Sequence, residues 1–250
     1  MNEPMDRYDR QCEREDLQHG LIVEELKSHF HSIDLENENI TVRRGFEAFP
    51  DFLYYPDLLL TIDDQSCGIS VITNLTPEND ERTGEEVRKR RQYFKKKHVP
   101  VLWIIEERSP ILEQHGQSIF LWRTELEAAN KTKEDRLWEL YVKGLIRDEQ
   151  FFRLYDFPVK AADQLVDVRS LCQIRYHESG SKIRVHRYLR EGMPKPNHVF
   201  HLATGSAWRL AEGLNNRDKQ LDFGDSDEEK SMRQRFLQDF EQRVTERRFE

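Results

Sequence analysis

The chain has 250 residues, enough for one large domain or two modest ones with a hydrophobic core. Its net charge of −8 argues against indiscriminate binding of nucleic acid by the whole surface. Cys12, Cys67 and Cys172 form no CxxC pair, which excludes a zinc ribbon and argues against a disulfide framework. No apolar run resembles a signal peptide or a membrane span, so we expect a cytoplasmic protein without a membrane partner.

The first half of the chain predicts alternating helices and strands. Residues 1–13 lack periodicity, and we expect a loose arm there. Residues 16–30 have apolar side chains at helical spacing and predict a helix. Residues 40–46 alternate between apolar and polar side chains, as in a half-buried strand. Continuous apolar runs at 58–62 and 69–73 predict buried strands joined by a tight turn.

A basic helix is predicted over residues 83–97, followed by a strand at 99–105 and an edge strand at 118–122. The strand, helix, strand succession with apolar runs predicts a sheet that is covered on both faces. Residues 14–125 therefore read as one α/β domain.

The second half has a different pattern, and we predict an α+β C-terminal domain over residues 126–212. Its main features are an amphipathic helix within 126–146 and a β-hairpin that turns at Glu178-Ser179-Gly180-Ser181. Residues 213–228 are acidic and predict a linker.

The last segment, 229–250, predicts an amphipathic helix because Met232, Phe236, Phe240 and Val244 recur every four residues. This helix could dock on the body of its own chain. It could equally pair with a protein partner or with a second copy of the chain.

Four short motifs in the first half occur in a distinctive order. They are His19 with Lys27, Pro56-Asp57 before a strand, Arg82-Thr83 after the next strand, and Val101-Leu102-Trp103-Ile104-Ile105. Over about residues 15–125 this order resembles the competence protein CoiA-like group of the PD-(D/E)XK nuclease superfamily. The resemblance implies a restriction-endonuclease-like mixed sheet core flanked by helices, followed here by the smaller α+β domain.

The resemblance also implies a metal site at Asp57. In that superfamily the Asp that opens a strand and a carboxylate on the next strand hold Mg²⁺, which polarises the scissile phosphate and activates a water. Where the family has Glu and Gln two residues apart, this chain has Ile72 and Asn74. Asp57 therefore lacks its partner carboxylate on that strand.

Three outcomes remain open for this site. Glu24 or Glu25 of the first helix supplies the missing carboxylate, or Glu81 or Glu85 does so from the start of the basic helix. Otherwise the site is inactive and the fold serves as a binding surface. For an active enzyme, a Mg²⁺-dependent deoxyribonuclease, the candidate catalytic residues are Asp57, Glu25 and Asn74, with Asp57 as the metal ligand.

The basic helix is the second functional signal. A run of charged residues in a helix is often only its solvent-exposed face, where oppositely charged residues one turn apart, such as Glu85 and Lys89, form ion pairs. The density of cations here nevertheless favours contacts with the phosphates of nucleic acid, most simply DNA. The candidate nucleic-acid-binding residues are Arg88, Lys89, Arg91, Lys95, Lys96 and Lys97 of the helix and Arg175 and Arg184 of the hairpin.

Two functions follow from these patterns. The first is a DNA-associated protein of nuclease fold, with metal-dependent hydrolysis if a substitute carboxylate exists. The second is a non-catalytic regulatory or protein-interaction module built on the same fold.

Overall fold

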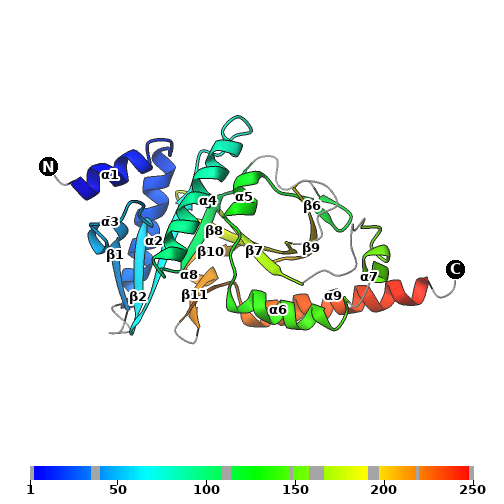
Figure 1. The fold of residues 1–250 in the computed structure, drawn as a ribbon. Helices are drawn as coiled ribbons and strands as arrows, with labels where there is room; N and C mark the ends of the chain where they lie inside the picture. The colour runs from blue at the N-terminus through cyan, green and yellow to red at the C-terminus, as the bar shows by residue number, and fades with distance from the viewer. Residues whose placement is uncertain are drawn as a thin grey trace.

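A computed structural model describes residues 3–34, 40–108, 114–146, 149–157, 166–190, 197–217 and 220–247. Within these ranges one mixed sheet of ten strands organises the fold (Figure 1). Nine strands follow one another across it, in the order β1 (Ile40–Arg44), β2 (Leu58–Ile62), β3 (Gln65–Ile72), β4 (Val101–Glu106), β7 (Val168–Arg175), β8 (Lys182–Leu189), β9 (His198–Thr204), β6 (Ser118–Phe120) and β5 (Gln114–His115). The tenth, β10 (Trp208–Arg209), pairs with β8.

Strands β1, β2 and β3 form an antiparallel meander, and β4 lies parallel to β3. A parallel neighbour requires a crossover connection. Helix α4 (Asp80–Lys96) provides it and packs on the sheet through Val87 and Phe94. The predicted strands and the basic helix of this region are therefore present, and the α/β class is confirmed.

The opposite face of these strands is covered by α2 (Leu17–Asp34). Ile22, Val23, Leu26 and Phe30 of this helix are buried in a core that also takes in side chains of β1 to β4 and of the β7–β8 hairpin. Burying such apolar side chains contributes about 1.5–3 kcal/mol each relative to exposure. The sheet thus has apolar side chains on both faces, as the continuous runs predict.

The sheet continues across the predicted boundary at residue 125. Strand β4 pairs in parallel with β7, and Ile104 lies opposite Cys172. The polar connection after β6 contains α5 (Arg123–Glu127), whose first N–H groups, those of Arg123 and Thr124, donate to the Asp80 carboxylate on α4. The two predicted segments therefore share one sheet.

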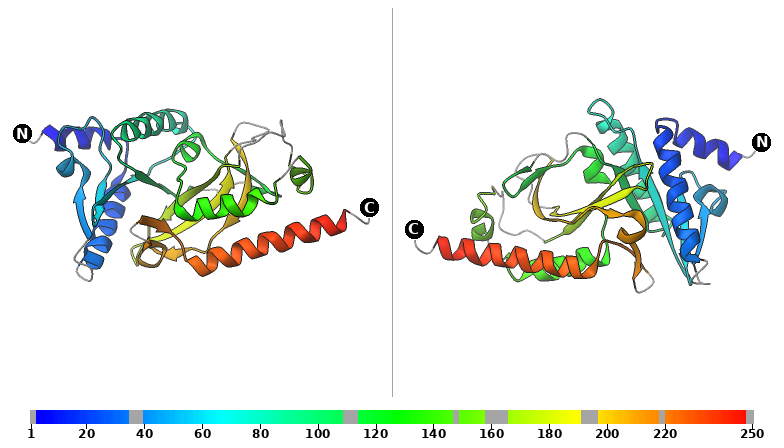
Figure 2. Two further views of the ribbon diagram at one scale, coloured as in Figure 1. Left: turned by 60° about the horizontal axis from the view of Figure 1, so that its bottom comes forward. Right: turned by 180° about the vertical axis from the view of Figure 1, so that it is seen from behind.

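A third core lies at the far end of the sheet, among α6 (Lys133–Lys143), α7 (Glu149–Arg153) and α9 (Ser226–Glu246). Both views in Figure 2 show α6 and α9 side by side, and residues of the two helices are in contact. Met232 and Phe236 of α9 are buried there, and Phe240 packs against them. The C-terminal helix thus packs on its own chain through Met232, Phe236 and Phe240 of its apolar stripe.

Two local predictions are wrong. The N-terminal arm contains α1 (Glu3–Gln11), which is ordered because Tyr8 is buried and bonds to the body of the protein. The predicted acidic linker follows directly on α8 (Leu210–Gly213) and contains a hairpin of β11 (Leu214–Arg217) and β12 (Gln220–Phe223). Leu214, Leu221 and Phe223 are buried in the core under α2, so apolar residues spaced among acidic ones hold this segment in place.

Candidate functional site

The Pro56-Asp57 motif is held at the start of β2 by close backbone packing. A Cβ on Gly45 would lie 2.0 Å from the carbonyl oxygen of Pro56, and one on Gly68 would lie 2.9 Å from Pro56 Cβ. Only glycine allows the chain to approach so closely. The Asp57 N–H donates to Ile69 O at 2.8 Å, which sets the position of Asp57 beside β3.

The Asp57 carboxylate is buried, with 1% of its side chain exposed. The Tyr8 hydroxyl donates to Oδ1 at 2.7 Å, and His19 Nε2 lies 3.2 Å from the same oxygen. The Val71 N–H donates to Oδ2 at 2.7 Å. Three elements, α1, α2 and β3, therefore converge on one carboxylate.

Electrostatics make this an ion pair. Burial favours the neutral acid, but the charge and hydrogen bond of His19, together with Arg90, outweigh it and hold the pKa of Asp57 below its usual range. Burial by itself would lower the pKa of His19, yet Asp57 and Glu15 beside it raise that pKa above its usual value. Both shifts favour the charged forms, an imidazolium beside a carboxylate.

The predicted partners Glu25 and Asn74 bond elsewhere. Glu25 accepts hydrogen bonds from the Ser181 N–H at 2.8 Å and from Ser181 Oγ at 2.5 Å, at the turn of the β7–β8 hairpin. The physical reason is helix geometry: His19 reaches Asp57, and Glu25 lies ~9 Å further along the axis of α2. Asn74 is exposed, and its N–H donates to Glu106 Oε2 at 2.9 Å.

Among the described residues, none of Glu24, Glu81 and Glu85 joins the group at Asp57, and Glu81 is exposed in the first turn of α4. Glu24 pairs with Arg44 on β1, and Glu85 pairs with Arg88 and Arg123. Ile72 is fully buried in the core beneath α4. The hydrogen bonds of Asp57 to Ile69 and Val71 place Ser70, not Ile72, at the level of the carboxylate.

Sequence reasoning missed Tyr8, Cys12 and Glu15. Glu15 Oε2 accepts from both Thr73 N (2.8 Å) and Thr73 Oγ1 (2.9 Å), and burial raises the pKa of Glu15 although Arg14 and His19 oppose the rise. No single periodic pattern joins them, because Tyr8 lies in α1, His19 lies in α2, and Cys12 and Glu15 lie in the connection between these helices. They were overlooked because the predicted arm had no apolar stripe.

The donor set does not fit Mg²⁺. That ion prefers hard oxygen ligands in octahedral geometry, usually one or two carboxylates with waters and substrate phosphate. Of the described residues, the group gathered at Asp57 consists of Cys12, His19 and Asp57, which offers sulfur, nitrogen and a single carboxylate. We therefore derive no Mg²⁺-dependent step at this site.

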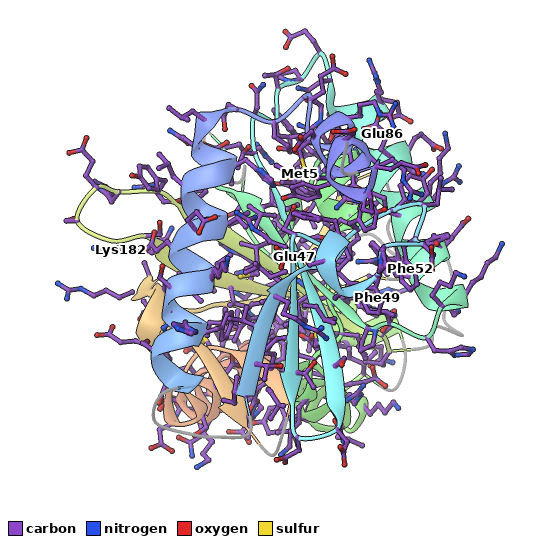
Figure 3. All side chains as sticks on the ribbon, turned by 90° about the vertical axis from the view of Figure 1, so that its left-hand side faces the viewer. Met5, Glu47, Phe49, Phe52, Glu86 and Lys182 are labelled. Carbon is purple, nitrogen blue, oxygen red and sulfur yellow. The ribbon has the colours of Figure 1, made fainter. Side chains whose placement is uncertain are left out.

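A cavity of about 470 Å³ lies beside this centre, between α1, the 53–54 loop and α4. Figure 3 looks onto this end of the sheet, with Glu86 of α4 beside α1 and with Phe49 and Phe52 below them. The cavity is lined by Arg7, Arg10, Gln11, Arg14, Glu15, Leu53, Tyr54, Thr83, Glu86, Val87, Lys89 and Arg90. Cationic side chains outnumber carboxylates in this wall, in a protein whose net charge is negative.

Several polar atoms in this wall have no hydrogen-bond partner although they are buried. They are Arg7 Nε, Thr83 Oγ1 and Arg90 Nε. Arg90 otherwise donates to Tyr55 O (3.3 Å) and Ser70 Oγ (3.2 Å), and its guanidinium lies 5.1 Å from the centre of the Trp103 ring. Leaving a buried donor unpaired costs about 1–3 kcal/mol, and because these three atoms are almost fully enclosed they are a cost of the packing around the cavity.

The cations of α4 do not form one continuous track. Arg88 is paired with Glu85, and Lys89 faces the cavity beside α1. Arg91 donates to Ala129 O and, with Lys95, lines a different cavity of about 540 Å³. Lys96 and Lys97 are exposed at the end of the helix, and Lys97 lies 5.4 Å from the centre of the Phe52 ring.

The hairpin cations are largely neutralised. Arg175 Nε lies 2.8 Å from Glu107 Oε2, and Arg184 Nη1 lies 3.4 Å from Glu107 Oε1. Both arginines thus share one carboxylate at the end of β4. They do not extend the cationic wall of the cavity beside α1.

Comparison of the chain with family models, with curated proteins and with solved structures gave no significant match. Within the described ranges, none of the helices combines the length and the apolar character needed to cross a lipid bilayer.

Proposed function

We propose that this protein binds the phosphate backbone of DNA in the cavity between α1 and α4, and that it does so without Mg²⁺-dependent hydrolysis at Asp57. The single observation that carries the proposal is the cationic wall of this cavity, where Arg7, Arg10, Arg14, Lys89 and Arg90 outnumber the carboxylates of Glu15 and Glu86. Phosphate oxygens accept several hydrogen bonds at once and carry the charge that an arginine-rich wall favours.

The remaining wall suits a nucleotide. Tyr54 offers an aromatic face beside the cations, and Leu53, which is 60% exposed, offers apolar surface at the rim. Stacking of bases on aromatic side chains combined with a cationic groove is the usual means of holding single strands. A volume of about 470 Å³ lies in the range of small-ligand sites, so the cavity admits one nucleotide rather than a duplex.

Topology supports a fold of the PD-(D/E)XK type. An N-terminal helix, an antiparallel meander of β1 to β3, the crossover α4 and a parallel β4 follow one another in the order that the resemblance implies. In such a fold Asp57 would occupy the metal-ligand position. Its carboxylate here is bonded by Tyr8, His19 and Val71, which supports a binding role over hydrolysis.

Fluorescence anisotropy with labelled single-stranded and double-stranded DNA tests the proposal. The double variant Arg10→Glu/Lys89→Glu reverses two exposed charges of the cavity wall. We expect the affinity to fall at least 10-fold. The slope of log affinity against log salt should become shallower by about 0.7 for each phosphate of a single strand that the variant no longer neutralises.

The matched control is Lys96→Glu/Lys97→Glu, which makes the same charge change at two exposed lysines at the C-terminal end of α4, outside the cavity. We expect this control to retain most of the affinity. Equal losses in both double variants would contradict a specific site in the cavity. Wild-type protein that binds neither form of DNA would overturn the proposal and favour the alternative function, a module that recognises a protein.

A further inference from the structure

Three metal-binding side chains of different chemistry meet beside the sheet. Cys12 follows α1, His19 lies in the first turns of α2, and Asp57 opens β2. One ligand atom of each, the thiol sulfur, an imidazole nitrogen and a carboxylate oxygen, lies within 4.8 Å of the other two. Residues far apart in the sequence thus bring one donor each to a single point.

The spacing is close to that of a tetrahedral site. Zinc bonds of ~2.0–2.1 Å to nitrogen or oxygen and ~2.3 Å to sulfur place neighbouring ligand atoms about 3.3–3.6 Å apart. His19 Nε2 and Asp57 Oδ1 are already 3.2 Å apart. The sulfur of Cys12 has to move by only about 1 Å to reach this spacing, which a rotation of a partly exposed side chain provides.

Neighbouring groups already orient the carboxylate. The Tyr8 hydroxyl donates to Oδ1 and the Val71 N–H donates to Oδ2, so Asp57 is held in place, and the second neighbour of Oδ1, His19 Nε2, is itself one of the three ligands. Outer hydrogen bonds of this kind orient the ligands of metal sites. Cys12 is the least buried of the three ligands, so an ion and a coordinated water have access from its side.

We infer that Cys12, His19 and Asp57 form a site for a zinc-type divalent ion. Binding releases the Cys12 thiol proton and the His19 Nε2 proton to solvent. The resulting thiolate, imidazole and single carboxylate suit Zn²⁺ or Co²⁺ and do not suit Mg²⁺ or Ca²⁺. This inference does not rest on the proposed function. The metal site nevertheless has a consequence for the proposed DNA-binding cavity. An ion bound here ties α1 to α2 and the sheet, and α1 carries Arg7 and Arg10 of the cavity wall.

Cobalt spectroscopy tests the site directly. Full-length protein freed of metal with a chelator is titrated with Co²⁺ under reducing conditions. We expect one equivalent to produce visible bands of tetrahedral cobalt together with a sulfur-to-cobalt charge-transfer band, and Zn²⁺ to displace both. Mg²⁺ in excess should displace neither.

Matched variants assign the ligands. Cys12→Ser should abolish the charge-transfer band, and His19→Gln should weaken binding by at least about 10-fold to 100-fold. Cys67→Ser, a control at a cysteine outside the cluster, should leave the spectrum unchanged. Circular dichroism establishes that each variant is folded.

Three results would overturn the inference: no charge-transfer band in the wild type, a band that survives Cys12→Ser, or a band that disappears in Cys67→Ser. None of these readouts involves DNA. Failure of the metal site and failure of DNA binding are therefore separate observations.

Discussion

His19 Nε2 lies 3.2 Å from Asp57 Oδ1, and the two side chains are only 7% and 1% exposed. The lowered pKa of Asp57 contributes stability that is present above its unfolded value and lost as the pH falls. The raised pKa of His19 contributes stability that is present below about pH 6.5 and lost as the pH rises through the raised value. The pair therefore stabilises the fold most between about pH 4 and pH 6.5.

Asp57→Asn should accordingly lower the free energy of unfolding by about 3 kcal/mol near pH 6, because it leaves the buried imidazolium without its counter-ion. Urea unfolding in the presence of a chelator measures the loss, which should shrink above the raised pKa of His19. The control is Asp51→Asn, the same change at an exposed position. A loss at Asp57 no larger than at Asp51 would contradict the ion pair.

A second histidine pair predicts the opposite response to pH. His186 Nδ1 and His201 Nε2 both lie 2.9 Å from Thr204 Oγ1, and His186 Nε2 lies 3.0 Å from Gln173 Oε1. Burial, with the nearby charge of His201, lowers the pKa of His186 to about 3, and burial lowers the pKa of His201 to about 4. Both rings stay neutral in the folded protein over the physiological range.

Stability should therefore fall as the pH drops below about 6.5, because the unfolded chain takes up protons that the folded chain excludes. Each histidine should contribute a loss of about 1–2 kcal/mol between pH 6.5 and pH 5. Denaturant midpoints across this range measure the slope. His186→Gln/His201→Gln should flatten it, and a slope as steep as that of the wild type would show that other groups are responsible.

Arg187 ties the far half of the sheet to two helices. Its Nη1 donates to Asp135 Oδ1 of α6 at 2.6 Å and its Nη2 donates to Glu229 Oε1 of α9 at 2.8 Å, and the side chains of this network are fully buried. Arg187→Met should cost about 3–5 kcal/mol, because two buried carboxylates lose their counter-ion.

Thermal or urea unfolding of this variant is compared with that of Lys230→Met. Lys230 and Asp227 form an ion pair on α9 whose side chains are 64% and 84% exposed, so its loss should cost under about 0.5 kcal/mol. Similar losses in the two variants would mean that the network around Arg187 adds nothing beyond a surface pair.

Hydrolysis is a separate prediction. Purified protein incubated with single-stranded or double-stranded DNA and Mg²⁺ should cleave no faster than an Asp57→Ala variant, because one carboxylate beside an imidazole nitrogen and a thiol sulfur is a poor Mg²⁺ site. Gel electrophoresis of the products measures the rate. Cleavage that requires Mg²⁺ and disappears in Asp57→Ala would contradict this prediction and support a nuclease activity at Asp57.

The sequence by itself determined the strands β1 to β4, the helices α2 and α4, and the place of Asp57 among them. A strand or helix needs an apolar face wherever it packs, so an apolar pattern in the sequence indicates burial. Examples are the continuous apolar run at 58–62 and the four-residue spacing of Met232 and Phe236. The Pro56-Asp57 motif likewise marks a strand start through local backbone preferences.

Only the tertiary structure decided what Asp57 meets. Its partners Tyr8, Cys12 and His19 lie 38 to 49 positions earlier in the chain. A polar segment such as α1 has no periodic apolar stripe from which its packing against the sheet could be predicted. The cationic wall that Arg7, Arg10 and Arg14 form with Lys89 and Arg90 of α4 is equally invisible in the sequence, because only folding brings these distant segments together.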